Sequence, residues 1–533
     1  MSQYEVIVVG AGIAGLTASV YLARAGKSVL LCERSDHAGG LVNSFVKDGF
    51  FFDGGMRAME NSGIVLPMLR ELGIPLEHRR SPVSIGIGNE FLRLEGTESL
   101  EEYGKMLGKL FPDETEGIAL ILAEIRKVMG YMDVLYGIDN PYFLDVKKNR
   151  KYFAQKVLPW LFRYAVNIRK AARLNEPVQT YLGRFTKNAA LIDMITQHFF
   201  RETPTFFALS YFSLYLDYFY PRGGTGSLVG ALTADLVSHG GILKTQTEIT
   251  AIDPLRRTVA TRMGEEFGYG NLIWAADAKR FYDLIDPKDL PKKKIRNRFL
   301  ANRDRAEAAL PGDSVHSLFL SLDIPPEDLG KTTGAHLFYT PTQTGLSPYP
   351  LSKIRTPEGT YTDSLPDLFG WLKSYLENTT YEISLPVLRY PDLAPAGKTG
   401  MIVSTLLDHG LVSHFAALGK YEEFKSFTEE TVLSVLNRSL HPGLRDKVLD
   451  VISASPLTIE RLTGNAGGAI TGWSFAGPEG PVSQGFENIA KAVYSPVPHV
   501  FQAGQWSFSP SGLPVSILTG KMAAKAAMKN LPR

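Results

Sequence analysis

Three glycines near the start of the chain have the spacing of a turn that binds phosphate. The segment Gly10-Ala11-Gly12-Ile13-Ala14-Gly15 matches G-x-G-x-x-G. In a dinucleotide site, Gly10 allows the tight turn, Gly12 lets the backbone approach a pyrophosphate, and Gly15 lets a helix pack closely on a strand. A helix beginning at Ile13 offers free N–H groups and the positive end of its dipole to the phosphates. These five residues are therefore candidates for binding a cofactor: Gly10, Gly12, Ile13, Ala14 and Gly15.

The residues around this turn predict the elements that would hold it in place. Glu5–Val9 is a β-branched run typical of a strand that is buried on both faces. A helical pattern follows from Ile13 to Ala25, and Gly26 ends it. Ser28–Leu31 predicts a second strand. Glu33 then stands about 20 residues beyond the turn, where an acid accepts hydrogen bonds from a ribose. Strand, turn, helix and acid together predict a dinucleotide site.

A targeting or membrane segment is the alternative for the same residues. Val6–Ala23 carries no charge and is long enough to resemble a signal peptide or a membrane span. No basic region precedes it, Glu5 stands at its start, and glycines interrupt it at the fingerprint spacing. These features favour nucleotide binding over targeting.

Length and composition indicate an ordinary folded protein. With 533 residues, 44% of them apolar and 21% charged, the chain should form two or three intertwined domains. A net charge of +2 is too balanced for a nucleic-acid binder. The single cysteine, Cys32, excludes an internal disulfide and a cysteine-based metal cluster, and we expect no metal site. A reducing cytoplasm is the expected compartment.

The residues after Glu33 carry a resemblance to a known family. Glu33-Arg34 is followed by Gly39-Gly40-Leu41 and then by the segment Gly49–Gly55, GFFFDGG. This arrangement resembles the FAD-dependent amine oxidase and phytoene desaturase superfamily, which implies FAD as the cofactor. Many members have Arg or Lys where Leu41 stands, so a phosphate contact would come from Arg34, from Arg57 or from the backbone. The resemblance adds these candidate cofactor-binding residues: Arg34, Gly39, Gly40, Leu41, Gly55, Met56 and Arg57.

Two later segments extend the resemblance to the rest of the cofactor domain. Tyr220–Leu228, YPRGGTGSL, precedes a helical pattern, a strand near Ile249 and an apolar strand that reaches Ala275. At the C-terminus, Val500–Gln505 ends in glycine, and Gly512 and Leu513 precede a helical pattern at Val515–Met528. In the superfamily this last helix points its N-terminus at the flavin ring, where it stabilises negative charge on the reduced form. The resemblance therefore implies cofactor contacts from Ile249, Ala275, Gly504, Gln505, Gly512 and Leu513.

The expected fold class is α/β, with a Rossmann-like FAD-binding domain interleaved with a mixed-sheet substrate domain and a helical insert. The FAD-binding domain is expected at residues 1–97, 220–285 and 496–533. Residues 98–219 are expected to form a helical, aromatic-rich substrate or lid region, and residues 286–495 a substrate domain with an antiparallel sheet. Its predicted strands are His316–Leu322, Tyr381–Val387 and Thr399–Leu406.

The predicted chemistry is that of an FAD-dependent oxidoreductase. Ser455–Gly472 resembles a pattern of the carotenoid desaturase, carotenoid isomerase and retinol saturase-like branch, which implies a long apolar isoprenoid or polyene substrate. Desaturation, saturation or cis-trans isomerisation would proceed by hydride transfer with flavin N5. Arg57, Glu460 and Arg461 are the candidate catalytic side chains. The alternatives are a flavin amine oxidase with Trp473 and Trp506 as an aromatic cage, a fatty-acid double-bond isomerase, and a non-catalytic FAD-binding lipid carrier.

Two kinds of segment leave alternatives open. The aromatic clusters Leu158–Phe162 and Phe206–Tyr220 predict either a helical core or the lining of a tunnel for an apolar substrate. The basic run Lys292–Arg298, with Arg303 and Arg305 beyond it, predicts either a solvated helix face or peripheral docking on anionic lipid, helped by Phe299 and Leu300.

Overall fold

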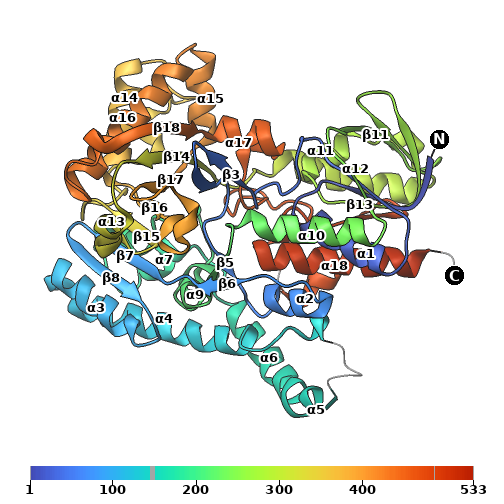
Figure 1. Cartoon of the computed structure of the whole chain (residues 1–533), viewed down its shortest axis with the longest axis horizontal. Coiled ribbons are helices and arrows are strands. Elements are labelled where there is room, and N and C mark those ends of the chain that lie inside the picture. The colour runs from blue at the N-terminus through green and yellow to red at the C-terminus, as the bar shows by residue number, and fades with distance from the viewer. Residues whose placement is uncertain (1, 145–149, 485, 532–533) are drawn as a thin grey trace.

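Two β-sheets with their covering helices make up most of the molecule (Figure 1). The computed structural model describes residues 2–144, 150–484 and 486–531. In Figure 1 the first sheet lies on the right and the second on the left, and the helices of residues 99–216 lie below them. Strands from both ends of the chain meet in the first sheet, so the two termini lie on the same side of the molecule.

The first sheet places the carboxyl ends of several strands at one edge. Strand β1 pairs in parallel with β2 and β13, and β13 pairs in parallel with β20. Parallel neighbours end at the same edge, which is where ligands bind in open α/β sheets. The strands, in sheet order, are β10 (Ile242–Lys244), β2 (Val29–Cys32), β1 (Ser2–Val9), β13 (Glu266–Trp274), β12 (Thr258–Thr261) and β11 (Ile249–Asp253), with β20 (Val500–Gln502) beside β13.

Both faces of this sheet are buried, as the run of apolar residues in β1 predicts. Val6 and Val8 pack on one face against α1 (Ile13–Arg24), α10 (Gly226–Ser238) and α18 (Leu513–Asn530). Ile7 and Val9 pack on the other face against α11 (Ala278–Asp283) and α12 (Lys293–Ala308). The Cys32 thiol is fully buried on this second face, and burial raises its pKa to about 12.

The second sheet is mixed. Its neighbouring strands are antiparallel except for β7 and β15, which are parallel. All three predicted strands of this domain are present, but β16 ends early at Ser384, before Pro386, which has no N–H to donate to a ladder. The strands, in sheet order, are β18 (Val448–Ala454), β14 (Ser314–Leu322), β17 (Thr399–Leu407), β16 (Tyr381–Ser384), β15 (His336–Thr340), β7 (Val83–Ile87) and β8 (Glu90–Leu94).

Alternation along these strands separates a helix-covered face from a face that looks toward the first sheet. Leu318 and Leu320 pack with α14 (Leu365–Asn378), α15 (His409–Ala417) and α16 (Tyr421–Ser439). Phe319, between them, points the other way and packs edge-on against Phe52 of β4 (Phe50–Asp53). The second face therefore supplies side chains to the space between the two halves.

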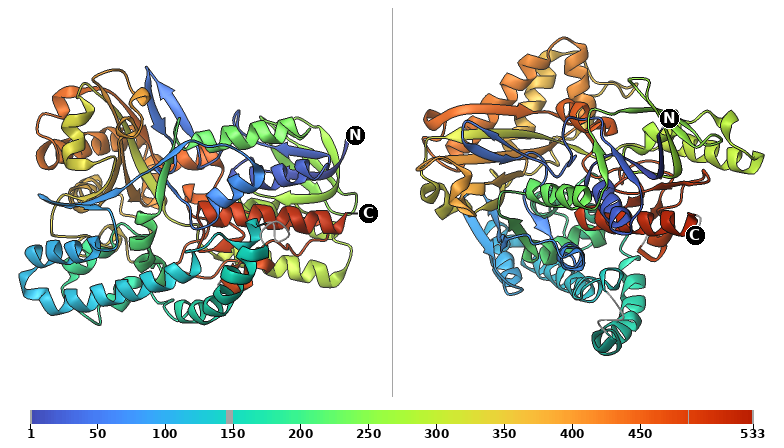
Figure 2. Two further views of the ribbon diagram at one scale, coloured as in Figure 1. Left: turned by 60° about the horizontal axis from the view of Figure 1, so that its bottom comes forward. Right: turned by 45° about the vertical axis from the view of Figure 1, so that its right-hand side comes forward.

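Residues 99–216 are mostly helical, as predicted, and form a layer with a core of its own. Helix α4 runs along the bottom of the molecule, and α6 projects outward from it (Figure 2). The helices are α3 (Ser99–Leu110), α4 (Thr115–Leu135), α5 (Arg150–Tyr152), α6 (Leu158–Ala171), α7 (Val178–Leu182), α8 (Ala189–Thr196) and α9 (Thr205–Leu216).

The structure corrects the expected boundaries at two places. Residues 83–94 form a hairpin of β7 and β8 that turns at Gly88, whose φ is +57°. Both strands belong to the second sheet, although residues 1–97 were expected to lie in the FAD-binding domain. Helix α12 packs on the first sheet, although it falls within 286–495. In both cases the long-range partner, which has no local sequence signal, decides the placement.

The uncharged segment Val6–Ala23 forms β1, the glycine turn and most of α1 inside the first core. Among the residues that the structure describes, none of the helices combines the length and the apolar composition needed to cross a bilayer.

Candidate functional site

A cavity of about 820 Å³ extends along the edge where the parallel strands of the first sheet end. Val9, Glu33, Ala275 and Gly504, each at or just beyond the end of a strand, line it. The cavity continues between the two sheets to side chains of the second sheet and of helices α4 and α9. Its lining includes every residue that the sequence predicts to bind the cofactor, except Gly15.

Gly12 and Gly15 have opposite surroundings, as their predicted roles require. A Cβ on Gly15 would lie 1.9 Å from the carbonyl oxygen of Gly10, so the glycine permits α1 to pack against the turn. A Cβ on Gly12 would meet no atom within 4 Å and would extend into the cavity. Similarly, a Cβ on Gly55 would lie 1.8 Å from the oxygen of Leu41. The bare backbone at Gly12 leaves the space in which a pyrophosphate would lie.

Glu33 is fixed at the cavity wall by the same turn. Its Oε2 accepts a hydrogen bond from Ala11 N at 2.8 Å, and its Oε1 accepts one from Ser35 N at 2.9 Å. The neighbouring Arg34 donates to the carbonyl oxygen of Arg461 at 2.6 Å, which ties it to α17 (Pro456–Thr463). Because Arg57 is also bound to protein acceptors, the first-turn N–H groups of α1 are the donors that face the phosphate space.

The N-terminus of α18 opens on the same cavity. After β20 the chain turns at Gly504, whose φ is +90°, and Gly512 is the N-cap residue of the helix. Gly504, Gln505, Gly512 and Leu513 all line the cavity. The first-turn N–H groups of this helix therefore present the positive end of its dipole to a bound group.

Glu60 lies beside this helix terminus and was not singled out from the sequence. Pairing of β5 (Met59–Glu60) with β9 (Tyr218–Pro221) positions its carboxyl group. A Cβ on Gly512 would lie 3.2 Å from its Oε1, so the carboxyl group lies close to the N-cap of α18, and it lines the cavity. Burial, reinforced by the nearby Asp217 carboxylate, raises the pKa of Glu60 to about 7. Near neutral pH this carboxyl group can therefore take up or release a proton.

Helix α9 divides its side chains between core and cavity. Ala208, Leu209 and Phe212 pack in the core of the helical layer, whereas Phe207 and Tyr211, on the other side of the helix, face the cavity. Part of the cluster Phe206–Tyr220 therefore lies in a helical core, and part of it lines the cavity. The aromatic and aliphatic residues that line this section are Met132, Tyr136, Phe200, Phe206, Phe207, Tyr211, Leu214 and Tyr218.

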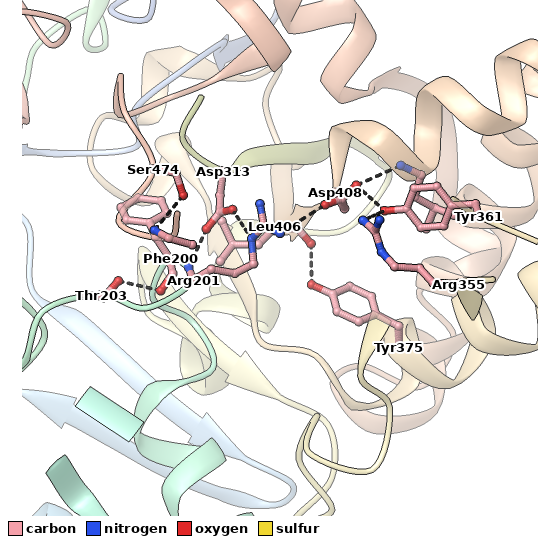
Figure 3. Close-up of polar contacts among 12 residues, drawn as sticks. Phe200, Arg201, Thr203, Asp313, Arg355, Tyr361, Tyr375, Leu406, Asp408 and Ser474 are labelled. Atoms are coloured by element: carbon pink, nitrogen blue, oxygen red, sulfur yellow. Dashed lines mark hydrogen bonds and ion pairs between the residues drawn. The ribbon is translucent and has the colours of Figure 1, made fainter. Parts of the chain in front are cut away.

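An ion-pair cluster holds the wall residue Phe200 in place (Figure 3). The next residue, Arg201, donates from Nε to Asp313 Oδ1 at 3.0 Å and pairs with Asp408 Oδ2 at 3.6 Å. Tyr361 donates to Asp408 Oδ1 at 2.6 Å. Asp313 directly precedes β14 and Asp408 directly precedes α15, so the cluster joins the helical layer to the second sheet.

A row of polar side chains crosses the second sheet where it faces the cavity. Ser317, Ser404 and Glu382 are direct neighbours on β14, β17 and β16. His336 of β15 contacts Glu382 through Nε2 at 2.9 Å, and Tyr218 stacks on its ring. His336, Glu382 and Ser404 line the cavity.

Arg57 reaches this polar row from the first half of the molecule. Its Nη2 donates to Ser404 Oγ at 2.6 Å and to Ser317 Oγ at 3.2 Å, and its Nη1 donates to the carbonyl oxygens of Asp53 and Gly55. The guanidinium is buried and still lines the cavity. It therefore fixes the second sheet against the turn at Gly55.

The negative charge of Glu382 is compensated by its neighbours. Burial raises the pKa of Glu382, but the hydrogen bond with His336 and the charges of Arg57 and Arg389 outweigh it, so the carboxylate titrates below its ordinary value. Burial lowers the pKa of His336, and Glu382 only partly opposes this. A neutral imidazole beside an ionised carboxylate is the resulting state near pH 7.

The remaining candidates from the sequence have other partners. Glu460 lies outside the cavity lining, where its Oε2 contacts His409 Nε2 at 2.8 Å and its Oε1 accepts from Gly467 N at 3.1 Å. Arg461 lines the cavity near Arg34. The rings of Trp473 and Trp506 pack edge to face at 5.0 Å and 89°, so they contact each other and do not form parallel walls around a substrate.

Comparison with protein families matches residues 13–528 to one family, described as flavin containing amine oxidoreductase. The chain belongs to this family. It is an FAD-dependent oxidoreductase, and its first sheet is the Rossmann-like FAD-binding fold. This agrees with the resemblance seen in the glycine motifs of residues 10–55.

Curated relatives cover nearly the whole chain at low identity. Prolycopene isomerase 2 of an Oncidium hybrid cultivar, a chloroplastic protein, is 25% identical over 566 residues, which span 99% of this chain and 84% of the relative. The all-trans-retinol 13,14-reductase of Homo sapiens is 25% identical over 579 residues, which span 99% of this chain and 85% of the relative.

Solved structures show the same fold. An oxidoreductase from Methanosarcina mazei has a TM-score of 0.60 at 15% identity and covers 98% of this chain and 99% of its own. Putrescine oxidase bound to putrescine has a TM-score of 0.58 at 13% identity, with 99% of each chain covered.

The cavity fits FAD in the chemistry of its lining. The space beside Gly12, the carboxylate of Glu33 and the N-terminus of α18 supply what a pyrophosphate, a ribose and a flavin ring respectively require. The side chains that the sequence did not reveal are Glu60 and the polar row of the second sheet. In the sequence, each strand that contributes to this polar row is mostly apolar. The polar residue that interrupts it is the local sign of the row.

Proposed function

We propose that this protein acts on a long apolar isoprenoid or polyene substrate, such as a carotenoid- or retinoid-like molecule. The reaction is a desaturation, a saturation or a cis-trans isomerisation. The observation that carries this proposal is one continuous cavity, which joins the nucleotide edge of the first sheet to an aromatic section from α9 and α4. An apolar chain lying in that section would present a carbon–carbon bond to the N-terminus of α18.

The relatives support the same substrate class. One is named for the isomerisation of prolycopene and the other for the reduction of retinol, and both match 99% of this chain. Their low identity leaves the individual substrate to experiment, whereas the apolar lining favours the class.

Bound FAD supplies the hydride chemistry, while the residues of the chain hold and orient the reactants. Gly12 and Glu33 would hold the pyrophosphate and ribose, and the first turn of α18 would face the ring. Glu60 is the proposed proton donor or acceptor, because its carboxyl group lies at this helix terminus inside the cavity. The aromatic side chains of α9 would exclude water from the reacting carbon.

The polar row offers a place for a polar end of the substrate. His336 lines the cavity, and within the described residues its buried Nδ1 has no hydrogen-bond partner. A hydroxyl group could satisfy this atom, whereas a pure hydrocarbon would leave it unpaired at a cost of about 1–3 kcal/mol. We therefore expect an alcohol to be preferred over the matching hydrocarbon.

The test begins with the purified protein. Flavin is released by denaturation and identified, co-extracted lipids are analysed by mass spectrometry, and the protein is then incubated without oxygen in its oxidised and reduced forms. The substrate panel is all-trans-retinol, a poly-cis carotene, a long-chain unsaturated fatty acid and putrescine.

Conversion of retinol or carotene, with the alcohol favoured, would support the proposal. Bleaching of the oxidised flavin by putrescine without conversion of any polyene would replace it with an amine oxidase. Conversion of the fatty acid alone would assign a double-bond isomerase, and FAD binding without turnover of any compound would assign a lipid carrier.

A further inference from the structure

Helix α6 exposes apolar side chains to solvent. Leu158, Leu161, Phe162 and Val166 are between 41% and 76% exposed, and Phe162 is the most exposed of them. These residues include most of the cluster Leu158–Phe162, for which the sequence predicted either a core or a tunnel lining. The structure shows neither for these side chains. Exposed apolar patches on proteins mark contacts with a partner or a membrane.

The exposed residues share one face of the helix. Positions 158, 161, 162 and 166 follow the i, i+3, i+4, i+8 spacing of a single stripe. A different face packs inward, where Ile168 and Ala171 form a small core with Leu135 and with the cavity residues Tyr136 and Phe206. Trp160 also anchors the helix, because its indole N–H donates to the carbonyl oxygen of Val134. The exposed stripe is therefore held outward by packing on its other side.

The charge around this stripe has one sign. No acidic residue occurs from position 150 to position 175. The basic residues of this segment flank the apolar stripe along the helix and at its ends: Arg150, Lys151, Lys156, Arg163, Arg169, Lys170 and Arg173. Apolar side chains on one face with Lys and Arg beside them are typical of a helix that lies in the interface of an anionic membrane.

The position of α6 allows that contact. Helices α5 and α6 project from the lower edge of the molecule in Figure 1 and in the right-hand view of Figure 2. In Figure 1 the two sheets lie above these helices, so α6 is at the periphery of the molecule, where a flat surface could reach its exposed side chains. Since α6 packs on Tyr136 and Phe206, the stripe is one helix away from the aromatic section of the cavity.

We propose that α6 docks this protein on an anionic lipid surface, with Leu158, Leu161, Phe162 and Val166 inserted among the lipids. The sequence left docking at Lys292–Arg298, with Arg303 and Arg305 beyond it, as one of two alternatives, and this proposal assigns docking to α6 instead. Phe299 of α12, which was expected to help there, is fully buried in the first core. The proposal rests on α6 alone, and it holds whichever substrate the cavity accepts.

The single cysteine makes a direct test practicable. Cys32 is buried, so Phe162→Cys can be labelled at one site with an environment-sensitive fluorophore. Leu255→Cys is the matched control, because Leu255 is also exposed, at 58%, but lies in the turn between β11 and β12. Vesicles of phosphatidylcholine with phosphatidylserine should shift the emission of the label at 162 to the blue and leave the label at 255 unchanged. Equal shifts at both sites, or no shift at 162, would overturn the proposal.

Cosedimentation with the same vesicles shows whether the basic residues of α6 or those of α12 contribute to binding. Leu161→Gln/Phe162→Gln should lower the bound fraction at least tenfold, and Arg163→Gln/Lys170→Gln should lower it most at low salt. Lys292→Gln/Lys293→Gln/Lys294→Gln on α12 should leave it unchanged. A loss confined to the α12 variant would overturn the assignment to α6.

Self-association is the competing explanation of the exposed stripe. Light scattering without vesicles distinguishes it, because a dimer formed through α6 would double the mass and would dissociate in Leu161→Gln/Phe162→Gln. That result would overturn the membrane proposal. A wild-type monomer that binds anionic vesicles would support it, and no step of these tests uses substrate or turnover.

Discussion

At the scale of single residues, two glycines of one motif have different surroundings. Gly15 permits packing, because its Cβ would lie 1.9 Å from Gly10 O, whereas Gly12 has a negative φ and faces an open cavity. A methyl group at these two positions should therefore damage different properties of the protein.

We expect Gly12→Ala to fold normally and to lose FAD, because its methyl group would occupy the phosphate space. Gly15→Ala should lower the apparent Tm even without FAD, because a backbone contact of 1.9 Å cannot be relaxed cheaply. Thermal melts of the FAD-free proteins and the flavin content of the purified variants measure both effects. Equal melting losses in the two variants would contradict the division of roles.

Glu60→Gln should lower kcat by about 10²–10⁴, the usual contribution of a positioned acid or base. The limb of the wild-type pH–rate profile near pH 7, set by the raised pKa of Glu60, should disappear in the variant. The folded protein holds the proton more tightly than the unfolded chain, whose Glu titrates at its ordinary 4.5. This contribution to stability is thus complete below about pH 4.5 and is lost as the pH rises toward 7.

The stability of Glu60→Gln gives an independent check. The amide has no charge to bury, so the stability of the variant relative to the wild type should increase as the pH rises, by about 2.5 kcal/mol between pH 5 and pH 8. Melting curves between pH 5 and pH 8 measure this. A difference that does not change with pH would mean that Glu60 does not titrate in this range.

At the scale of elements, Arg57 links the turn at Gly55 to the second sheet by hydrogen bonds. Its Nη2 binds the hydroxyls of Ser317 and Ser404 on β14 and β17, and its charge compensates Glu382. The Arg201 cluster also joins two parts of the molecule, at the start of β14 and the end of β17, but Arg201 is half-exposed, and an exposed pair contributes less.

Arg57→Met should lower the free energy of unfolding by about 3–5 kcal/mol, because it removes the buried hydrogen bonds of the guanidinium and part of the positive charge that compensates Glu382. Arg57→Lys should lose less stability than Arg57→Met, because lysine keeps the positive charge but has fewer hydrogen-bond donors. Arg256→Met is the control, because Arg256 is exposed and should change stability by about 0.5 kcal/mol or less. Denaturant titrations followed by tryptophan fluorescence measure the three. If Arg57→Met lowers the free energy of unfolding no more than Arg256→Met does, Arg57 does not link the two parts of the molecule as described.

At the scale of the whole molecule, the cavity lies between the two sheets, so a bound cofactor should stabilise the assembly of both. FAD at about 100 times its Kd should add about 2.7 kcal/mol and raise the apparent Tm by several degrees. Glu33→Ala should reduce this gain at the same FAD concentration, because the acid that would hold the ribose is removed. Scanning calorimetry with and without FAD measures it. An unchanged gain in Glu33→Ala would remove Glu33 from the site.

The sequence predicted the local geometry of the glycine turn and its flanking strand and helix, because the constraints there are local. A tight turn, a closely packed helix and a free phosphate space each require glycine within a few residues. The spacing G-x-G-x-x-G, followed by Glu33, therefore indicates the local geometry directly. The strands at 316–322 and 399–406 and the helix of α18 also followed from local periodicity. The family match over residues 13–528 agrees with these motifs.

Only the tertiary structure decided which distant residues meet and which apolar faces stay exposed. His336, Glu382, Ser404 and Ser317 come together through strand register, and Arg57 joins them from a segment more than 250 residues away. Glu60 has a pKa near 7 because the surrounding fold buries it, and its own neighbours in the sequence do not show this. Helix α6 carries two apolar stripes, and periodicity alone cannot tell which one packs. Burial depends on long-range partners, and these are fixed only when the chain has folded.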